Sequence, residues 1–342
     1  MDYPLITVTI AAYRVEKFIR KSVLSVLEQD YPNIEVLIVD DCGGDSSVDI
    51  VNEISNNHPR GNTIKLVSHP KNIGTGGARN TGIDNSTGEY IYFLDGDDYL
   101  QPNALSTLFH VIKNSSDDFV VACHQKVDEK GNVIEIRKFP IGHYQGENAI
   151  GIWMKEHRAW FPCYLWNKLY RTSFLRKNNI KCILPDRNED VWFTFQVFCT
   201  CKSFTFVDDI LLNYVIRDGS TMHQSISDFY INEYVEIMNH ICNYLNTHFT
   251  TDNMPRLLGD YIGYYFFGGV FTGAVMNSDC NAKVKKDYLN SISIIKNSNF
   301  KTSDFCERKN KIIFNLLKYN TRYYLLKIYL IGVRIIYSIH KR

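Results

Sequence analysis

Short apolar runs alternate with amphipathic stretches along the first hundred residues of the chain. Between the runs, apolar residues recur every three or four positions, which predicts helices. The runs themselves are rich in β-branched and aromatic residues, as expected of strands buried in a parallel sheet. They are Leu5–Ile10, Glu35–Val39, Ile64–Val67 and Tyr90–Leu94. This alternation predicts an α/β fold with a mostly parallel, doubly wound sheet flanked by helices.

The pattern changes in the rest of the chain. It predicts a strand at Phe119–Cys123, a hairpin around Lys130–Asn132, a helix at Val191–Phe198 and a strand pair within Phe204–Tyr214. From about Phe229 onward the pattern is helical. We therefore expect one domain of residues 1–225 and a helical C-terminal region of residues 226–342. No run of about 18 uncharged apolar residues occurs, so no segment is expected to cross a bilayer.

Composition excludes several classes of protein. Hydrophobic residues make up 45% of the 342 positions, which indicates a folded chain. Lys and Arg number 38 and Asp and Glu 37, so no global charge favours a nucleic-acid partner. The N-terminus lacks the basic flank and cleavage site of a secretory signal. We therefore expect a cytoplasmic location. The nine cysteines form no CxxC pair with the spacing of a zinc site, and we interpret them as reduced, mostly buried thiols.

Two acidic clusters follow predicted strands. In doubly wound sheets, ligands bind beyond the carboxyl ends of the strands. Asp95 and Asp97 stand at alternate positions after the fourth strand, and paired carboxylates of this kind suit Mg²⁺ or Mn²⁺. Such a metal neutralises a departing diphosphate. The alternative is an acidic turn that caps the next helix. Asp40 and Asp41 follow the second strand and either accept hydrogen bonds from a nucleotide or cap the helix before Ser46.

Two further segments carry candidate chemistry. Lys71–Gly82 is rich in glycine and contains Arg79, so its backbone N–H groups and the guanidinium could meet phosphate. A purely structural loop is the alternative. Glu189 and Asp190 open a helix, where a carboxylate could deprotonate an acceptor hydroxyl or simply complement the helix dipole.

In this order and at these intervals, the motifs resemble the family 2 inverting glycosyltransferases of GT-A fold, a Rossmann-like architecture, over about residues 5–220. The matching segments are Thr7–Tyr13, Val39–Asp41 with Asp45, Asn72–Gly82, Phe93–Asp98 and Glu189–Asp190. The resemblance implies a nucleoside-diphosphate sugar as donor, a divalent metal, and a single displacement that inverts the anomeric carbon.

The resemblance also implies roles for individual residues. Asp41 is expected to contact the nucleobase, Asp95 to lie near the ribose and the metal, and Asp97 to bind the metal. Asp190 is expected to be the catalytic base, and Arg79 to lie near the nucleotide or its diphosphate.

Further donor contacts are expected from Ala11 and Tyr13 in the first loop, and from Arg217 and Ser220 in a segment that resembles the family's loop over the donor phosphates. Two departures concern the base pocket. Many relatives have Pro and Asn where this chain has Ala11–Arg14, and Cys42-Gly43 replaces the usual Gly-Ser. The identity of the nucleotide therefore stays open.

Aromatic residues lie between the metal cluster and the proposed base, where relatives form the acceptor side. Trp166 offers an apolar face to a sugar ring, Lys168 offers donors to its hydroxyls, and Glu189 lies beside the proposed base. Packing in the core explains such aromatic residues equally well.

The last 35 residues are basic. From Arg308 to Arg342 there are nine Lys or Arg and no acid, and Lys327, Arg334 and Lys341 share one helical face. Each such charge contributes about 1 kcal/mol near an anionic lipid surface. This segment predicts peripheral association with the inner face of the cytoplasmic membrane. A helix docked on the catalytic domain is the alternative.

We therefore expect a hexosyltransferase that moves a sugar, from UDP-hexose or UDP-N-acetylhexosamine, to a glycan or lipid-linked acceptor in bacterial cell-surface polysaccharide synthesis. The alternatives are a sugar-phosphate nucleotidyltransferase, which would release pyrophosphate, and a non-catalytic glycan-binding relative. A nicotinamide dehydrogenase is disfavoured because the first strand lacks the glycine fingerprint. The sequence leaves the oligomeric state open.

Overall fold

The structure is a computed structural model of the whole chain. It describes residues 3–147, 149–157, 161–184 and 189–217, and ten helical positions between 236 and 248. The chain divides into two compact units, residues 1–149 with 162–223, and residues 150–161 with 224–342. The second unit contains most of α5 (Ala149–His157). The basic segment 308–342 lies outside the described residues.

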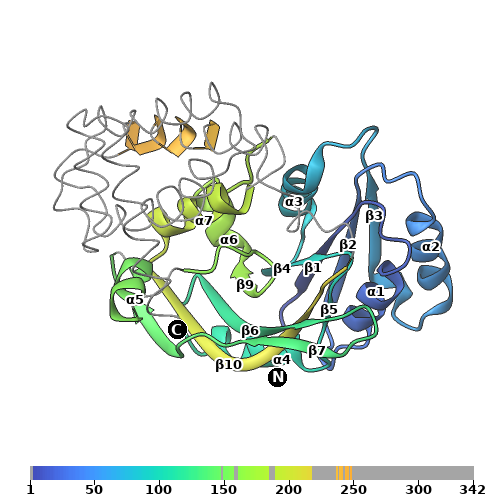
Figure 1. Cartoon of the computed structure of the whole chain (residues 1–342), viewed down its shortest axis with the longest axis horizontal. Coiled ribbons are helices and arrows are strands. Elements are labelled where there is room, and N and C mark those ends of the chain that lie inside the picture. Colours follow the sequence, from blue (N-terminus) through green and yellow to red (C-terminus); the bar gives the residue numbers. More distant parts are fainter. Residues whose placement is uncertain are drawn as a thin grey trace, which may run out of the picture. The chain divides into compact units, whose positions relative to one another are not determined.

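The first half of the larger unit is the predicted parallel α/β layer. Its strands are β1 (Ile6–Ala12), β2 (Ile34–Asp40), β3 (Ile64–Ser68) and β4 (Tyr90–Asp95), paired in parallel in the order β3-β2-β1-β4. Helices α1 (Ile19–Leu27), α2 (Ser47–Asn57) and α3 (Gly74–Asn85) connect them, with a short 3₁₀ turn at Gly61–Thr63. Figure 1 shows α1 and α2 gathered beside β1, β2 and β3. The predicted α/β class is confirmed.

Strand β2 explains why this layer is stable. Val36 and Ile38 belong to the large core that α1 and α2 complete, whereas Leu37 and Val39 pack with Ala78 of α3 on the opposite face. Both faces of the strand are thus buried, as expected of a continuous apolar run in a parallel sheet.

The second half of the unit is mixed in strand direction. Its strands are β5 (Tyr99–Leu100), β6 (Phe119–Val127), β7 (Val133–Arg137), β8 (Gly142–Gln145), β9 (Lys168–Arg171) and β10 (Ser203–Val215). They continue the sheet in the order β4-β9-β6-β10-β5, with β7 beside β6 and β8 beside β10. Only β6 and β10 pair in parallel in this described half. Helices α4 (Ala104–Lys113), α6 (Thr172–Lys177) and α7 (Glu189–Thr200) complete the unit.

Two details differ from the sequence predictions. Helix α3 begins at Gly74, so the glycine-rich segment forms its first turns and does not precede it as a loop. The expected strand pair within Phe204–Tyr214 is one strand of 13 residues, β10, which curves through the second half in Figure 1. The register of β10 against β6 shifts between Phe206 and Ile210, and this irregularity lets a single strand bend where a turn had been predicted. The hairpin around Lys130–Asn132 is confirmed by the antiparallel pair β6 and β7.

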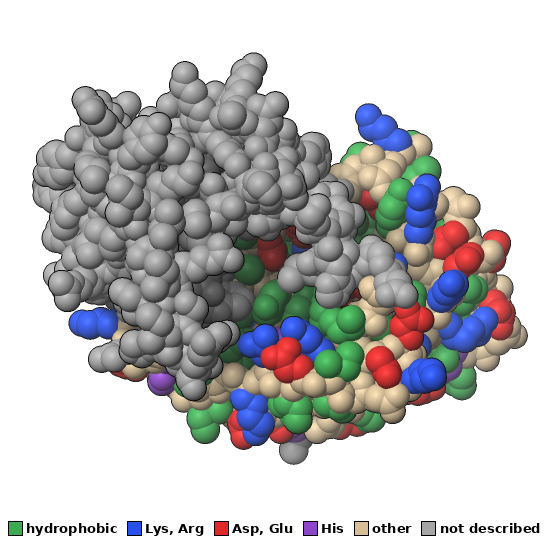
Figure 2. Space-filling model, in the orientation of Figure 1, with side chains coloured by type: hydrophobic (Ala, Val, Ile, Leu, Met, Phe, Trp, Pro, Cys, Tyr) green, Lys and Arg blue, Asp and Glu red, His purple; other side chains and the backbone are tan. Residues whose placement is uncertain are grey.

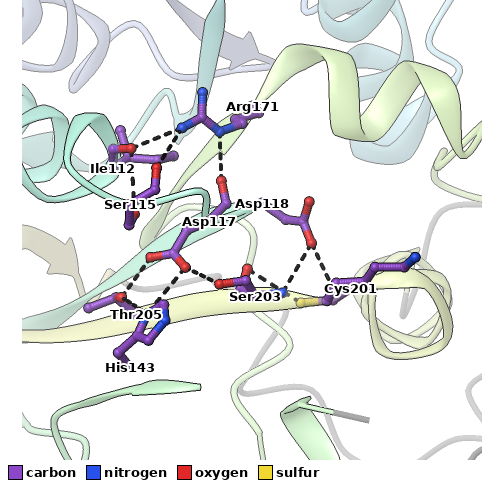
Figure 3. A network of polar contacts seen from close by, with 10 residues as sticks. Ile112, Ser115, Asp117, Asp118, His143, Arg171, Cys201, Ser203 and Thr205 are labelled. Carbon is purple, nitrogen blue, oxygen red and sulfur yellow. Dashed lines mark hydrogen bonds and ion pairs between the residues drawn. The ribbon is translucent and has the colours of Figure 1, made fainter. Parts of the chain in front are cut away.

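Buried polar contacts join the first residues of β6 and β10 (Figure 3). Asp117 is fully buried and accepts hydrogen bonds from Ser203 and, at 2.6 Å, from Thr205. The carboxylate of Asp118 accepts from the backbone N–H of Lys202 at 2.8 Å, and Arg171 donates to the backbone oxygen of Asp117 at 2.7 Å. These contacts fix the strand ends that lie farthest from the segment Asp95-Gly96-Asp97-Asp98, called the DGDD cluster below.

The balanced numbers of basic and acidic residues and the state of the cysteines can both be followed in the structure. Basic and acidic side chains of the described residues are interspersed on the face shown in Figure 2. The cysteines within the described residues are free thiols, most of them buried. Among the described helices, none is long and apolar enough to cross a membrane.

Candidate active site

Three strands of the parallel half end at one edge of the sheet. Ala11 of β1 is paired with Val39 on one side and with Asp95 on the other. The acidic clusters after β2 and β4 are therefore about 10 Å apart, two strand spacings. Gly96 permits the close approach of the chain, because its N–H donates to Ala11 O at 3.1 Å and an added Cβ would lie 2.8 Å from that oxygen.

Asp41 anchors the glycine-rich segment to this edge. It is 2% exposed, and its carboxylate accepts from the backbone N–H of Ile73 at 2.9 Å and of Gly74 at 2.7 Å. The same carboxylate contacts His69 Nδ1 at 2.7 Å, and His69 Nε2 lies 2.8 Å from Thr81 Oγ1. A carboxylate has about four lone-pair sites. Three are engaged by the protein, and the expected contact of Asp41 with a nucleobase stays a prediction.

The loops after β1 and β2 meet under backbone strain. Arg14 and Cys42 have positive φ angles of 53° and 59°, which are uncommon for residues other than glycine. Gly43, which follows Cys42, lies close against the first of these loops, because a Cβ there would approach Arg14 N to 2.8 Å. Tyr13 is 41% exposed, with the Arg14 guanidinium 5.2 Å from its ring centroid. An exposed ring at this edge is free of the core and can stack on a planar ligand.

Arg79 brings two of the predicted motifs together. Its guanidinium donates from Nη2 to Asp95 Oδ1 at 2.9 Å and from Nη1 to Glu189 Oε1 at 2.5 Å, although Glu189 is 110 residues away in the chain. Burial alone would lower the pKa of Arg79, but Asp95 and Glu189 outweigh it and raise the pKa, so the side chain keeps its charge. The end of β4 and the first turn of α7 thus share one buried cation.

The DGDD cluster is also tied to the end of β10. Arg217 Nε donates to Asp97 Oδ2 at 2.6 Å, and the backbone N–H of Val215 donates to Asp98 Oδ1 at 2.8 Å. Burial and the charge of Asp95 raise the pKa of Asp97, and Arg217 opposes them. Asp98 is 1% exposed, and burial together with the charges of Asp97 and Asp95 raises its pKa well above the usual value, so we assign it a structural role.

The proposed base, Asp190, lies in the first turn of α7 beside Glu189. Burial raises its pKa, while Arg79 and a hydrogen bond from Cys163 oppose the shift. The Cys163 thiol donates to Asp190 Oδ2 at 3.5 Å. A raised pKa moves a carboxyl group toward the range in which a general base works best.

The residues expected on the acceptor side are buried. Trp166 is 6% exposed and stacks on Tyr164 at 4.5 Å and on Tyr214 at 5.5 Å between ring centroids. Lys168 is 1% exposed, and its ammonium donates to Pro162 O at 3.0 Å, to Tyr164 O and to Asn167 Oδ1 at 2.8 Å. These contacts favour a positioning role for Lys168 over direct contact with a sugar hydroxyl. The expected acceptor contacts stay predictions.

Two participants were missed by the sequence reading, and one prediction cannot be placed. His69 follows β3 directly, so the edge position beside Asp41 was a signal that could have identified it. Nothing in the sequence indicated Cys163, because its contact with Asp190 depends on how the 162–167 segment packs. Ser220 lies outside the described residues.

The fold and these motifs define a class of protein. The model of the family "Glycosyl transferase family 2" matches residues 7–179, about half of the chain. The chain belongs to this family.

Individual relatives are similar over part of their length. The glycosyltransferase EpsH of Bacillus subtilis is 28% identical over 233 residues, which cover 66% of this chain and 64% of EpsH. Glycosyltransferase GlyA of Streptococcus pneumoniae is 27% identical over 221 residues, which cover 63% of this chain and 31% of GlyA. The chain therefore spans less than two thirds of these relatives.

A solved structure has the same fold. TarS of S. aureus, residues 1–349 in complex with UDP-GlcNAc, matches with a TM-score of 0.74 at 21% identity, covering 92% of this chain and 88% of that one. This similarity confirms the GT-A type of fold.

Proposed function

We propose that this glycosyltransferase transfers a hexosyl or N-acetylhexosaminyl group from a UDP-sugar to a hydroxyl group, with inversion at the anomeric carbon. The observation that carries the proposal is the Arg79 bridge, which holds Asp95 of the DGDD cluster and Glu189 of α7 on one guanidinium. Donor-binding and base candidates thereby lie at one edge of the sheet. The UDP-GlcNAc bound to TarS supports a uridine nucleotide as donor.

The chemistry follows from the groups at this edge. Asp190 removes the proton of an acceptor hydroxyl, and the oxygen attacks the anomeric carbon as the bond to the nucleoside diphosphate breaks. One carboxylate acting on the nucleophile in a single displacement inverts the anomeric configuration. Arg79 and Arg217 place positive charge where the leaving diphosphate becomes more negative, which stabilises the transition state.

The residues present fit a divalent cation. Asp95 and Asp97 offer oxygen ligands, and their side chains are 25% and 21% exposed. Within the described residues, no group of three or more His, Cys, Asp or Glu side chains is arranged to hold a metal. Mg²⁺ is commonly held by one or two carboxylates together with substrate phosphates. We therefore assign Asp97 and Asp95 as the protein's metal ligands, with Mn²⁺ or Mg²⁺ bound together with the donor, where it would neutralise the leaving diphosphate.

The acceptor and the location belong to the same proposal. We assign a glycan or lipid-linked acceptor of cell-surface polysaccharide synthesis at the inner face of the cytoplasmic membrane. The support is the basic segment 308–342 in the sequence, whose charges suit an anionic lipid surface.

A panel of sugar nucleotides tests the proposal. The full-length protein is heated with UDP-, GDP- or TDP-sugars and Mn²⁺ or Mg²⁺, since a bound ligand raises the melting temperature by mass action. Transfer is then followed as release of nucleoside diphosphate, and the anomeric configuration of the product is read by NMR. We expect stabilisation by a UDP-sugar and an inverted product.

Two results would contradict this function. Pyrophosphate release from a sugar phosphate and UTP would identify a nucleotidyltransferase. Full turnover by Asp190→Asn would rule out Asp190 as the base, because the amide cannot accept the proton.

A further inference from the structure

The carboxylate of Asp190 has an unusual hydrogen-bond partner. Its Oδ2 accepts from the thiol of Cys163 at 3.5 Å, and its Oδ1 accepts from the backbone N–H of Val191 at 2.8 Å. Cys163 is 8% exposed. The strong donor nearby, Arg79, is held by Glu189 and Asp95. The guanidinium therefore binds Glu189, and the side-chain donor to Asp190 is the weak thiol of Cys163.

The strength of the donor matters for a base. A charged donor in direct contact strongly favours the ionised carboxylate and makes it a poor proton acceptor. A thiol is a weak donor. It can fix the rotation of the carboxylate while lowering its basicity less than a charged donor would.

The segment that carries Cys163 is fastened on several sides. Thr194, one turn along α7, donates to Cys163 O at 2.9 Å. The buried ammonium of Lys168 donates to Pro162 O, Tyr164 O and Asn167 Oδ1. Asn167 is in turn joined to Ala122 of β6 by backbone and side-chain hydrogen bonds at 2.9 and 3.1 Å.

Burying a lysine is costly unless its ammonium is well satisfied. Burial lowers the pKa of Lys168 to about 7, and Cys163 and Asp190 act in the opposite direction. These three acceptors of Lys168 come from the one short segment that presents the thiol. The buried Lys168 ammonium therefore stabilises the conformation of this segment.

We propose that Cys163, held in place by Lys168 and Thr194, is a positioning residue that orients the Asp190 carboxylate toward the acceptor hydroxyl. The proposal rests on the assignment of Asp190 as the base. The charged and titratable groups that face Asp190 are Arg79 of α3, Lys168 of β9, Glu189 of its own helix, and Cys163 and Tyr164 of the preceding segment.

The test compares Cys163→Ala and Cys163→Ser with the full-length wild type, using the pH dependence of kcat and kcat/KM. Cys163→Ala removes the donor, so we expect kcat to fall by about tenfold or more with the KM for the donor unchanged. The acidic limb of the profile should move to higher pH, because the ionised carboxylate loses a hydrogen bond. Cys163→Ser keeps a donor, and a hydroxyl is a stronger donor than a thiol, so this variant should recover most of kcat and move the limb below the wild-type position.

Cys123→Ala is the matched control. Cys123 is a fully buried thiol that donates to Val207 O and accepts from the backbone N–H of Phe139, away from Asp190. This variant should lose some stability and keep the wild-type pH profile. An identical change in the profile of Cys123→Ala would show that loss of any buried thiol causes the effect, and would overturn the proposal.

Other outcomes are equally decisive. Wild-type kcat and pH profile in folded Cys163→Ala would overturn the proposal. If that variant does not fold, Cys163→Ser decides, because an unshifted acidic limb would count against the orienting contact and a shift to lower pH would support it. Asp190→Asn separates the two levels: an active Asp190→Asn overturns the base assignment, whereas an inactive Asp190→Asn with unaffected Cys163 variants overturns only the positioning role.

Discussion

Arg79 is the residue on which the geometry of the candidate site depends most directly. A guanidinium presents several N–H groups in a fixed plane, so one side chain can serve two carboxylates at once. Here these carboxylates are Asp95 and Glu189, and the arginine is 6% exposed. Removing one partner of such a buried arrangement leaves an uncompensated charge.

We predict that Arg79→Lys abolishes most activity even though the charge is kept. An ammonium acts as a point charge and cannot hold both carboxylates in the same geometry, so kcat should fall about a hundredfold and the free energy of unfolding by about 3 kcal/mol. Steady-state kinetics and urea denaturation measure the two effects. Arg20→Lys is the control, because Arg20 pairs with Glu53 at the exposed surface and its replacement should change little.

Glu35 provides a prediction of pH dependence away from the site. Burial on its own would raise the pKa of Glu35, but hydrogen bonds from Lys65, Thr7 and Thr87 outweigh it and lower the pKa to about 2, from 4.5. The ionised form is therefore favoured by folding. Its contribution to stability is complete above about pH 4.5 and is lost as the pH falls toward 2.

We predict that Glu35→Gln lowers the melting temperature at pH 7 and flattens the acid dependence of stability between pH 5 and pH 2. Calorimetry across this range measures both. Glu129→Gln, at an exposed position, should follow the wild-type curve. An unchanged slope in Glu35→Gln would show that the contacts with Lys65, Thr7 and Thr87 do not favour the ionised form.

At the scale of elements, β10 joins a buried polar network at one end to the candidate site at the other. Its first residues are held by Asp117 and Asp118, which bind Ser203 and Thr205. At its other end, Val215 contacts Asp98, and Arg217, two residues beyond the strand, contacts Asp97. Because β6 and β10 run in parallel, these two sets of contacts lie at opposite ends of the strands. Stability and activity should therefore respond separately to mutation at the two ends.

The buried end provides the stability prediction. Asp117→Ala leaves the hydroxyls of Ser203 and Thr205 without their carboxylate, so the free energy of unfolding should fall by about 2–3 kcal/mol. The kcat of the folded variant should stay near the wild-type value. Urea denaturation and kinetics below the unfolding transition measure the two. Ser203→Ala, which removes one of these hydrogen bonds, should cost less, and a large drop in kcat for either variant would contradict the separation.

The other end provides a prediction about the metal. Arg217 engages Asp97 through a single contact and is 28% exposed on its side chain, whereas Arg79 is buried between two carboxylates. Arg217 is thus the exchangeable cation of the pair. We predict that Arg217→Gln binds Mn²⁺ several-fold more tightly than the wild type in the absence of donor, since the Asp97 carboxylate then lacks its partner.

Calorimetric titration of Mn²⁺ into the donor-free protein measures this affinity. Asp97→Asn is the reference for loss of the ligand and should bind Mn²⁺ more weakly than either protein. Unchanged or weaker binding by Arg217→Gln would show that the arginine does not compete with the cation.

At the scale of the whole molecule, the candidate site lies within the described residues, and the proposed membrane contact lies in the basic segment 308–342. Family membership rests on residues 7–179. The last 35 residues carry nine Lys or Arg and no acid. The charges of the described residues are interspersed on the face shown in Figure 2, so a local basic segment would dominate the attraction of this face to an anionic membrane.

We predict that replacing Lys327, Arg334 and Lys341 by Gln reduces binding to phosphatidylglycerol vesicles by about a hundredfold, at about 1 kcal/mol for each charge. Flotation with these vesicles and with neutral phosphatidylcholine vesicles measures it. The matched control replaces Lys17, Lys130 and Lys202, three exposed lysines of the larger unit, by Gln. Equal losses in the two triple variants would indicate a general charge effect and contradict a dedicated segment.

The sequence by itself determined the parallel half of the fold. The apolar runs that became β1, β2 and β4 have few alternatives to burial, and acids at their ends must meet at one edge because parallel strands end together. The family motifs follow these apolar runs directly in the chain. The sequence therefore predicted the family without knowledge of long-range contacts.

Only the tertiary structure decided which partners the candidate residues have. The start of α3 at Gly74, the single bent strand β10 and the division of Arg79 and Cys163 between Glu189 and Asp190 depend on packing between segments far apart in the chain. A local pattern carries no information on such partners, because a side chain's hydrogen bonds and burial are set by whichever segment folds against it.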